Sequence, residues 1–152
     1  RMVRVNCMAP MLLTQRFIPQ LVQRKRAGIV ITSSVESLMG FPNSAPYAAS
    51  KAFASSLAEG LWGELQPQGV DVLALCPGST DTETHAIQGI NRDKLGVMMS
   101  PEQVAREALD NIDNGPVFIS GEENRQMFEG VVSMPRRDAL LMMGESMKAV
   151  LE

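Results

Sequence analysis

Two short apolar runs, separated by a long stretch with helical spacing, constrain the fold of this chain more than any other feature. The first run, AGIVITSS, ends near Ser33 and Ser34, and the second, GVDVLALCPG, is apolar from Val70 to Cys76 and stops at a Pro-Gly pair. Both contain β-branched residues and are too short for a buried helix, which predicts strands covered on both faces. A third short run, GPVFIS, predicts a further strand.

Segments with helical spacing of apolar residues alternate with these runs. The first covers residues 1–26, contains two prolines that we expect to bend it, and has a basic last turn that complements the helix dipole. The second covers about 44–66, begins at Asn43 or Ser44 as its cap, and accommodates Pro46 in its first turn.

Two more helices are predicted in the second half of the chain. A capping box begins one of them, with Ser100 as cap, Pro101 at the first helical position and Gln103 reaching back. The tail predicts a final helix with one apolar face. The residues of that face are Leu140, Leu141, Met143, Met147, Val150 and Leu151.

Strands that alternate with helices of more than ten residues indicate βαβ units. The sequence therefore predicts an α/β fold, a doubly wound, Rossmann-like parallel sheet of about three strands with helices on both faces. Residues 1–152 are expected to form a single domain. Ligands of such sheets bind beyond the carboxyl ends of the strands, which directs attention to Ser34, the loop before Tyr47, and the sequence PGSTDT.

Composition narrows the classes of function. The net charge is −3 and the basic residues are dispersed, so neither nucleic acid nor an anionic membrane is an expected partner. The chain contains no apolar run near the ~20 residues of a membrane span, and we expect a cytoplasmic protein. Cys7 and Cys76 lie far apart and His85 is the only histidine, so no metal site is predicted.

The single tyrosine of the chain lies one helical turn before a lysine. Tyr47 and Lys51 are four residues apart and share one helix face, where an ammonium group would lower the pKa of the phenol. Ser34, thirteen residues before the tyrosine, could place a hydroxyl beside it. Together these groups could move a proton onto or off an alcohol or carbonyl oxygen.

The YxxxK spacing alone is a weak signal. It arises by chance in about one sequence in four of this length, and such a pair is more often an amphipathic helix face with an extended lysine. The combination with other motifs is what favours a functional site.

Four motifs, in order, resemble those of the short-chain dehydrogenases/reductases. They are an asparagine in VRVNCMAP, a serine in ITSSVESLMG, YAASK, and PGSTDT as a match to PGxxxT. Asn6 precedes Ser34 by 28 residues, a family-like spacing. The resemblance implies an oxidoreductase that transfers a hydride between NAD or NADP and an alcohol or ketone.

The resemblance also implies a role for each matching residue. Tyr47 would be the general acid/base, Ser34 would polarise the substrate oxygen, and Asn6 would support a proton-relay water. Lys51 would lower the tyrosine pKa and, with Tyr47, contact the nicotinamide ribose. The residues expected to line the nicotinamide are Pro77, Gly78 and Thr82, with Thr82 near its carboxamide.

This sequence departs from the family pattern in one respect. The TGxxxGxG turn and the NNAG-like stretch of family members are absent, so no residue here is expected to hold the pyrophosphate. The chain resembles the later part of the family's domain. Either it is a portion of a longer reductase, or it is a truncated, non-catalytic binding or assembly module that keeps these residues as scaffold.

Substrate and assembly follow only from the resemblance. Residues 79–100 are expected to be the variable segment that, with the final helix, shapes the substrate pocket. A homodimer or homotetramer through the helices that contain Asn6 and Tyr47 is the expected assembly. A serine hydrolase based on Ser34 is disfavoured because GxSxG is absent.

Overall fold

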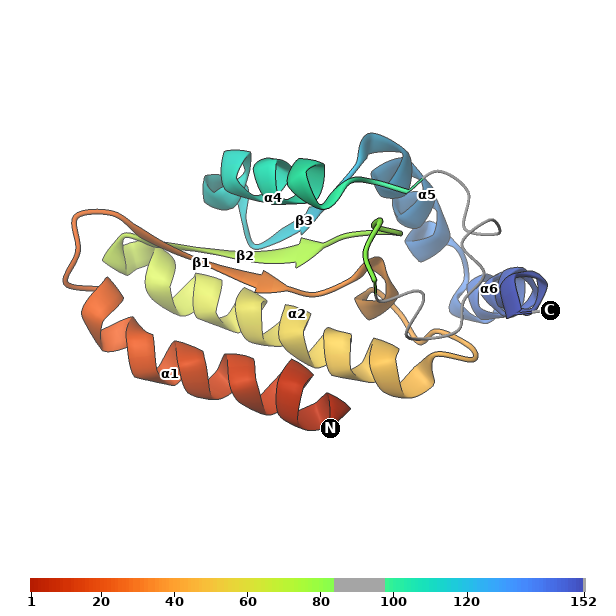
Figure 1. The fold of residues 1–152 in the computed structure, drawn as a ribbon, viewed down its shortest axis with the longest axis horizontal. Coiled ribbons are helices and arrows are strands. Elements are labelled where there is room, and N and C mark those ends of the chain that lie inside the picture. The colour runs from red at the N-terminus through yellow and green to blue at the C-terminus, as the bar shows by residue number, and fades with distance from the viewer. Residues whose placement is uncertain (84–97, 152) are drawn as a thin grey trace.

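A computed structural model describes residues 1–83 and 98–151, with side chains through Lys148. Figure 1 shows a small sheet between two layers of helices, with the N-terminal helix alongside the longest helix. Within the described residues, no helix is long and apolar enough to cross a membrane.

Three parallel strands form the sheet in the order β1-β2-β3. The strands are β1 (Ala27–Thr32), β2 (Val70–Cys76) and β3 (Val117–Ile119). Thr32 is in register with Leu75, and Cys76 with Ile119, so the carboxyl ends of the strands lie at one edge. The predicted strands and their parallel arrangement are confirmed.

Helices cover both faces of the sheet, as predicted. Helices α1 and α2 lie on one face and α4 on the other (Figure 1). The helical segments are η1 (Arg4–Met8), α1 (Ala9–Leu21), η2 (Val35–Ser37), α2 (Ala45–Leu65), η3 (Gln66–Gln68), α4 (Pro101–Asp110), η5 (Ile112–Asn114), α5 (Glu122–Ser133) and α6 (Arg136–Leu151).

Alternate side chains of β2 divide between these two layers. Val72 and Ala74 face α2, where they pack with the fully buried Ala58. Leu75 packs on the opposite side against Val104 of α4. Small residues on α2 allow that helix to lie close to the sheet.

A third apolar cluster lies beyond the carboxyl edge of the sheet. It joins η2 and the first turns of α2 to α5 and α6. Its buried members are Val35, Met39, Phe41, Ala48, Phe128, Val131, Ala139 and Met143. This cluster supports the loop that precedes Tyr47.

Several details of the predicted helices are wrong. The first helix opens with a π-helical turn, and its basic residues follow Leu21 in a turn, so they do not form its last turn. The tail folds into two helices because Pro135 interrupts it. Leu141, assigned to the apolar face, is 61% exposed.

Only half of the capping box forms. The Ser100 hydroxyl accepts a hydrogen bond from the Gln103 backbone N–H at 3.1 Å, as predicted. The Gln103 side chain does not reach back but donates to Glu107 Oε1 at 3.0 Å.

Glu107 joins α4 to the turn between β3 and α5. Its Oε2 accepts hydrogen bonds from Ser120 Oγ and from the Gly121 backbone N–H, each at 2.8 Å. Burial raises the pKa of Glu107, but the bonds from Gln103, Ser120 and Gly121 and the charge of Arg125 hold it below its ordinary value. Because the Ser120 side chain is fully buried, its hydroxyl depends on this carboxylate.

We expect Glu107→Ala to lower the free energy of unfolding by about 1–3 kcal/mol, because the buried Ser120 hydroxyl and the half-buried Gly121 N–H lose their acceptor. The carboxylate stabilises the fold above its unfolded pKa near 4.5, and this stabilisation is lost as the pH falls through the lower folded pKa. Urea unfolding at pH 7 and pH 3 would measure the effect, which should be smaller at pH 3. The control is Glu102→Ala, an exposed carboxylate on the same helix, for which we expect a change within about 0.5 kcal/mol. Equal costs for the two variants would contradict the assignment.

Candidate active site

One cleft of about 400 Å³ lies at the carboxyl ends of β1 and β2. It is bounded by the end of β1, the first turns of α2, the loop after β2 and the start of α4. Its lining includes Ser34, Tyr47, Lys51, Pro77, Gly78 and Thr82. Six of the seven predicted site residues therefore share one cleft.

Ser34 and Tyr47 line this cleft together, and hydrogen bonding by the Ser34 side chain lowers the pKa of the phenol. Ser34 has an extended backbone, with φ of −168°, and is the N-cap of η2. Its Oγ accepts a hydrogen bond from the Glu36 backbone N–H at 3.2 Å. Because this bond uses a lone pair, the hydroxyl proton remains available to donate to the phenol or to a substrate oxygen.

Lys51 is held between the helix and the end of β1. Its Nζ donates a hydrogen bond to the Thr32 carbonyl oxygen at 3.0 Å and lies 5.6 Å from the centroid of the Tyr47 ring. The four-residue spacing therefore does place the ammonium group on the same helix face as the phenol, as predicted.

The pKa of Tyr47 differs in direction from the expectation. Burial raises the pKa above its ordinary value, the Ser34 hydrogen bond lowers it, and the charge of Glu36 raises it. Burial also lowers the pKa of Lys51. Desolvation is the largest influence on each group and disfavours its charged form, so the phenol holds its proton at neutral pH.

Asn6 does not line this cleft. It lies in the π-helical turn η1 and, with Lys51, lines a neighbouring hollow of about 370 Å³ beside β1. Its Nδ2 donates to Ser50 Oγ at 2.9 Å, and Ser50 Oγ donates to the Tyr47 carbonyl oxygen at 2.8 Å. Asn6 thus contacts the backbone of the tyrosine turn through Ser50.

The Pro-Gly loop is fixed from both sides. The Val35 backbone N–H donates to the Pro77 carbonyl oxygen at 3.1 Å. On the other side, a Cβ at Gly78 would lie 2.5 Å from Asn124 Oδ1 of α5, so a larger residue here would have to displace the Asn124 side chain. Asn124 itself donates to the Ser120 carbonyl oxygen at 2.9 Å.

The segment after this loop returns beside its own start. Thr80 and Met99 form a parallel β-bridge, and the Asp81 backbone N–H donates to the Met99 carbonyl oxygen at 2.9 Å. The expected variable segment 79–100 is therefore closed at its base. Most of it, including His85, lies outside the described residues.

Glu36 is a site residue that the sequence analysis missed. It lies two residues after Ser34, and burial raises the pKa of its carboxyl group, while hydrogen bonding by Ser44 lowers it. Its Oε2 is buried without a hydrogen-bond partner among the residues described. An acidic residue in the otherwise apolar and small-residue loop VESLMGFPNSAP was the available signal.

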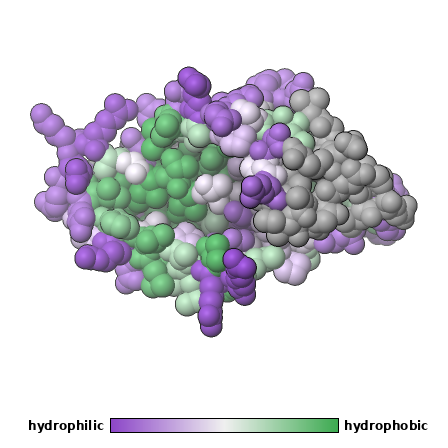
Figure 2. Space-filling view, viewed as in Figure 1, coloured by the Kyte–Doolittle hydropathy of each residue, from purple (hydrophilic) through white to green (hydrophobic). Residues whose placement is uncertain are grey.

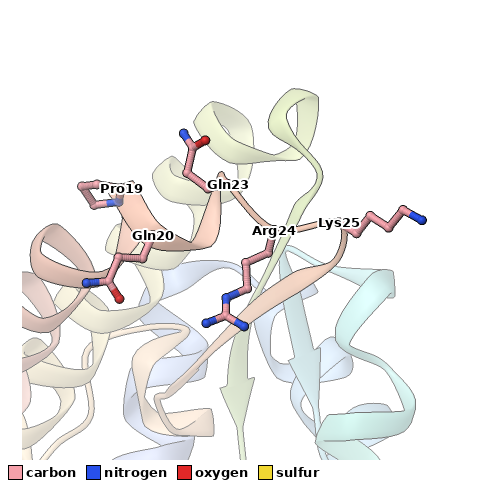
Figure 3. Close-up of a pocket in the computed structure, with 5 residues that line it drawn as sticks. All are labelled: Pro19, Gln20, Gln23, Arg24 and Lys25. Carbon is pink, nitrogen blue, oxygen red and sulfur yellow. The ribbon is translucent and has the colours of Figure 1, made fainter.

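A larger hollow, of about 650 Å³, lies at the other end of α1 and contains none of the predicted residues. Figure 3 shows its side chains pointing away from one another, with Gln23 and Arg24 on opposite sides of the ribbon. Divergent, exposed side chains do not form a ligand site.

Similarity to known proteins agrees with this arrangement. A family model described as short chain dehydrogenase matches residues 1–93. The chain is similar to the 7beta-hydroxysteroid dehydrogenase of Clostridium sardiniense, 28% identical over 146 residues, with 95% of this chain and 56% of the relative covered. It is 26% identical over 134 residues to the inactive 2-(S)-hydroxypropyl-CoM dehydrogenase 2 of Xanthobacter autotrophicus, covering 80% of this chain and 58% of that one.

A solved short chain dehydrogenase from Burkholderia cenocepacia, in complex with NADP, has a similar structure. The TM-score is 0.72 at 25% identity, and the match covers 92% of this chain and 56% of that one. The chain belongs to the short-chain dehydrogenase family. It spans little more than half the length of these relatives.

We expect Glu36→Gln to lower the pKa of Tyr47, because a negative charge beside the phenol is removed. Tyr47 is the only tyrosine of the chain, so phenolate absorbance near 295 nm reports it directly. A midpoint that stays unchanged or rises would contradict this role.

The same substitution should change the pH dependence of stability. Burial raises the pKa of Glu36 above 4.5 in the folded chain, so its proton stabilises the fold below that pH and the stabilisation is lost as the pH rises through the folded pKa. Glu36→Gln should therefore gain melting temperature relative to the wild type between pH 4 and pH 7. The control is Glu59→Gln, an exposed carboxylate of α2, for which neither measurement should change.

Proposed function

We propose that the chain carries the catalytic groups of an NAD- or NADP-dependent dehydrogenase that interconverts a small alcohol and a ketone. The observation that supports this best is the shared cleft in which the Ser34 hydroxyl, the Tyr47 phenol and the Lys51 ammonium group meet the Pro-Gly loop. These groups suit proton transfer at an oxygen beside a planar ring.

In carbonyl reduction, Tyr47 is the general acid. Its raised pKa keeps the phenol protonated at neutral pH, so it can donate a proton to the substrate oxygen. Ser34 donates a hydrogen bond to the same oxygen, and its lone pair stays engaged by the Glu36 N–H. The nearby Lys51 stabilises the phenolate that remains after the transfer.

A nicotinamide dinucleotide, when bound, supplies the hydride that the substrate carbon accepts. Tyr47 and Lys51 would contact its ribose, while Pro77, Gly78 and Thr82 would line the nicotinamide. The position of Pro77, Gly78 and Thr82 in the cleft lining supports this. The solved relative with NADP supports the same cofactor class.

The segment 79–100 would shape the substrate end of the cleft. Its base is anchored by the Thr80–Met99 bridge beside Thr82, which lines the cleft. Variation within this segment would select among alcohols and ketones without changing the proton-transfer groups.

We expect Tyr47→Phe to lower kcat for ketone reduction by about 10²–10⁴-fold, because the phenylalanine ring fills the same space but cannot donate a proton. Absorbance of the reduced cofactor at 340 nm measures the rate. Cofactor affinity, followed by the fluorescence of reduced nicotinamide, should change little. Retained turnover in this variant would contradict the role of Tyr47.

A non-catalytic binding or assembly module is the second candidate. The similarity to a relative named inactive supports it. No reduced-nicotinamide fluorescence enhancement at millimolar cofactor would favour this candidate over the dehydrogenase. Trp62 is a poor reporter for this test because it packs against Gly115, and neither residue lines the cleft.

Assembly through α1 and α2, as a homodimer or homotetramer, is part of the proposal. Figure 2 shows an apolar patch in the left half of the view, with hydrophilic side chains around it, and α1 exposes large side chains that include Leu12 and Phe17. Exposed apolar surface of this extent favours association.

We expect Leu12→Glu to dissociate the oligomer by placing a charge in the apolar interface. Leu12 is 51% exposed, and Leu109 of α4 is a matched control at 68%. Sedimentation velocity would measure the state of each variant. An unchanged oligomer in Leu12→Glu, or dissociation by Leu109→Glu, would contradict an interface on α1.

A further inference from the structure

A buried group of three serines adjoins the cleft, and one of them, Ser33, is part of its lining. The serine cluster consists of Ser33 at the end of β1, Ser37 in η2 and Ser55 in α2. Their exposed fractions are 3%, 9% and 7%. Ser33 Oγ and Ser55 Oγ are 2.7 Å apart, and Ser55 Oγ donates to Ser37 Oγ at 2.9 Å.

The serine cluster is bonded to the backbone of the lysine turn. Ser33 Oγ donates to the Lys51 carbonyl oxygen at 2.8 Å. Ser33 is the neighbour of Ser34, and Ser55 lies one turn after Lys51 on the same helix. These bonds therefore join the strand end that carries the Ser34 hydroxyl to the helix that carries Tyr47 and Lys51.

The serine cluster also reaches β2. Cys76 Sγ lies 3.7 Å from Ser37 Oγ and 3.9 Å from Ser55 Oγ. Cys76 is fully buried and immediately precedes Pro77. The serine cluster and Cys76 thus connect the end of β1, η2, α2 and the end of β2, which are the elements around the predicted site residues of the cleft.

The hydrogen bonds of the serine cluster fix the position of α2 relative to the sheet more closely than the surrounding apolar contacts can. The contacts of Ala54 and Ala58 with the sheet are non-directional and tolerate small shifts of α2 along its axis. Hydrogen bonds fix both distance and angle, and loss of one partner leaves buried hydroxyl groups unsatisfied. Ser55 has contacts in both directions, to Ser33 and to Ser37, so it is the central member.

We propose that Ser55 is a positioning residue that sets the placement of the Tyr47 and Lys51 side chains relative to the Ser34 hydroxyl. Only the expected effect of Ser55 on the turnover rate rests on the proposed dehydrogenase function. The geometric consequence, a change in the position of the Tyr47 phenol relative to the Ser34 hydroxyl, does not depend on turnover.

The decisive comparison is Ser55→Ala against Ser56→Ala in the full chain. The two serines are neighbours on α2, but Ser56 is exposed. A misplacement of about 1 Å costs on the order of 10²-fold in rate, so we expect kcat to fall about 10- to 100-fold in Ser55→Ala. The KM for cofactor should rise, because Lys51 and Tyr47 would also contact the nicotinamide ribose, and Ser56→Ala should behave as the wild type in both constants.

The titration midpoint of Tyr47 distinguishes a positioning role from a purely structural one, because a loss of stability alone would leave this midpoint unchanged. Ser55→Ala should raise the phenol's midpoint, because a phenol displaced from the Ser34 hydroxyl loses an influence that lowers its pKa. The titratable groups beside the phenol in the described part of the chain are Glu36 and Lys51. Cys76 lies beside Lys51 and contacts Ser55, and the substitution removes no ionisable group. The difference spectrum against a Tyr47→Phe background isolates this tyrosine.

Ser55→Cys, which keeps a donor and acceptor of similar size, should recover part of both losses. If Ser55→Ala does not fold, kcat and the Tyr47 titration midpoint can be measured in Ser55→Cys and Ser33→Ala instead. A folded Ser55→Ala with the wild-type kcat and midpoint would overturn the inference. A wild-type protein without dehydrogenase activity would overturn the proposed function, while the titration would still decide the role of Ser55.

Discussion

The parallel register of β1 and β2 is the constraint on which the rest of this structure depends. It aligns the ends of two buried strands, so the Thr32 carbonyl, the Ser34 hydroxyl and the Pro-Gly loop meet at one edge. Helix α2 then lies across this edge because its small side chains permit a close approach. The first turns of α2 place Tyr47 and Lys51 at the same edge, where they form one wall of the cleft.

Burial determines the protonation of this cleft more than the pairing of charges does. It raises the pKa of Tyr47 and lowers that of Lys51, so in both residues the neutral form gains. The Ser34 bond acts in the opposite direction on the phenol. A site of this kind holds a proton ready for donation, and the groups around it decide how readily the proton is lost.

The sequence predicted what depends on short-range pattern. Apolar runs located β1 and β2, and the four-residue spacing placed Tyr47 and Lys51 on one helix face. What it missed depends on distant partners. The direction of the Tyr47 pKa follows from burial by elements far along the chain, and the engagement of Asn6 with Ser50 spans 44 residues. The burial of the Glu36 carboxyl group was missed for the same reason, because the residues that bury it are brought together only by the fold.

The outer edge of β1 has a consequence for the cleft. Within the described residues β1 pairs only with β2, so the main-chain groups on its other side face the hollow that Asn6 lines. Thr32, at the end of this strand, supplies the carbonyl that anchors the Lys51 ammonium group. Water or a further strand bound along that edge of β1 would contact the main-chain groups near Thr32. Any shift of the Thr32 carbonyl oxygen would also move the Lys51 ammonium group, which donates to it.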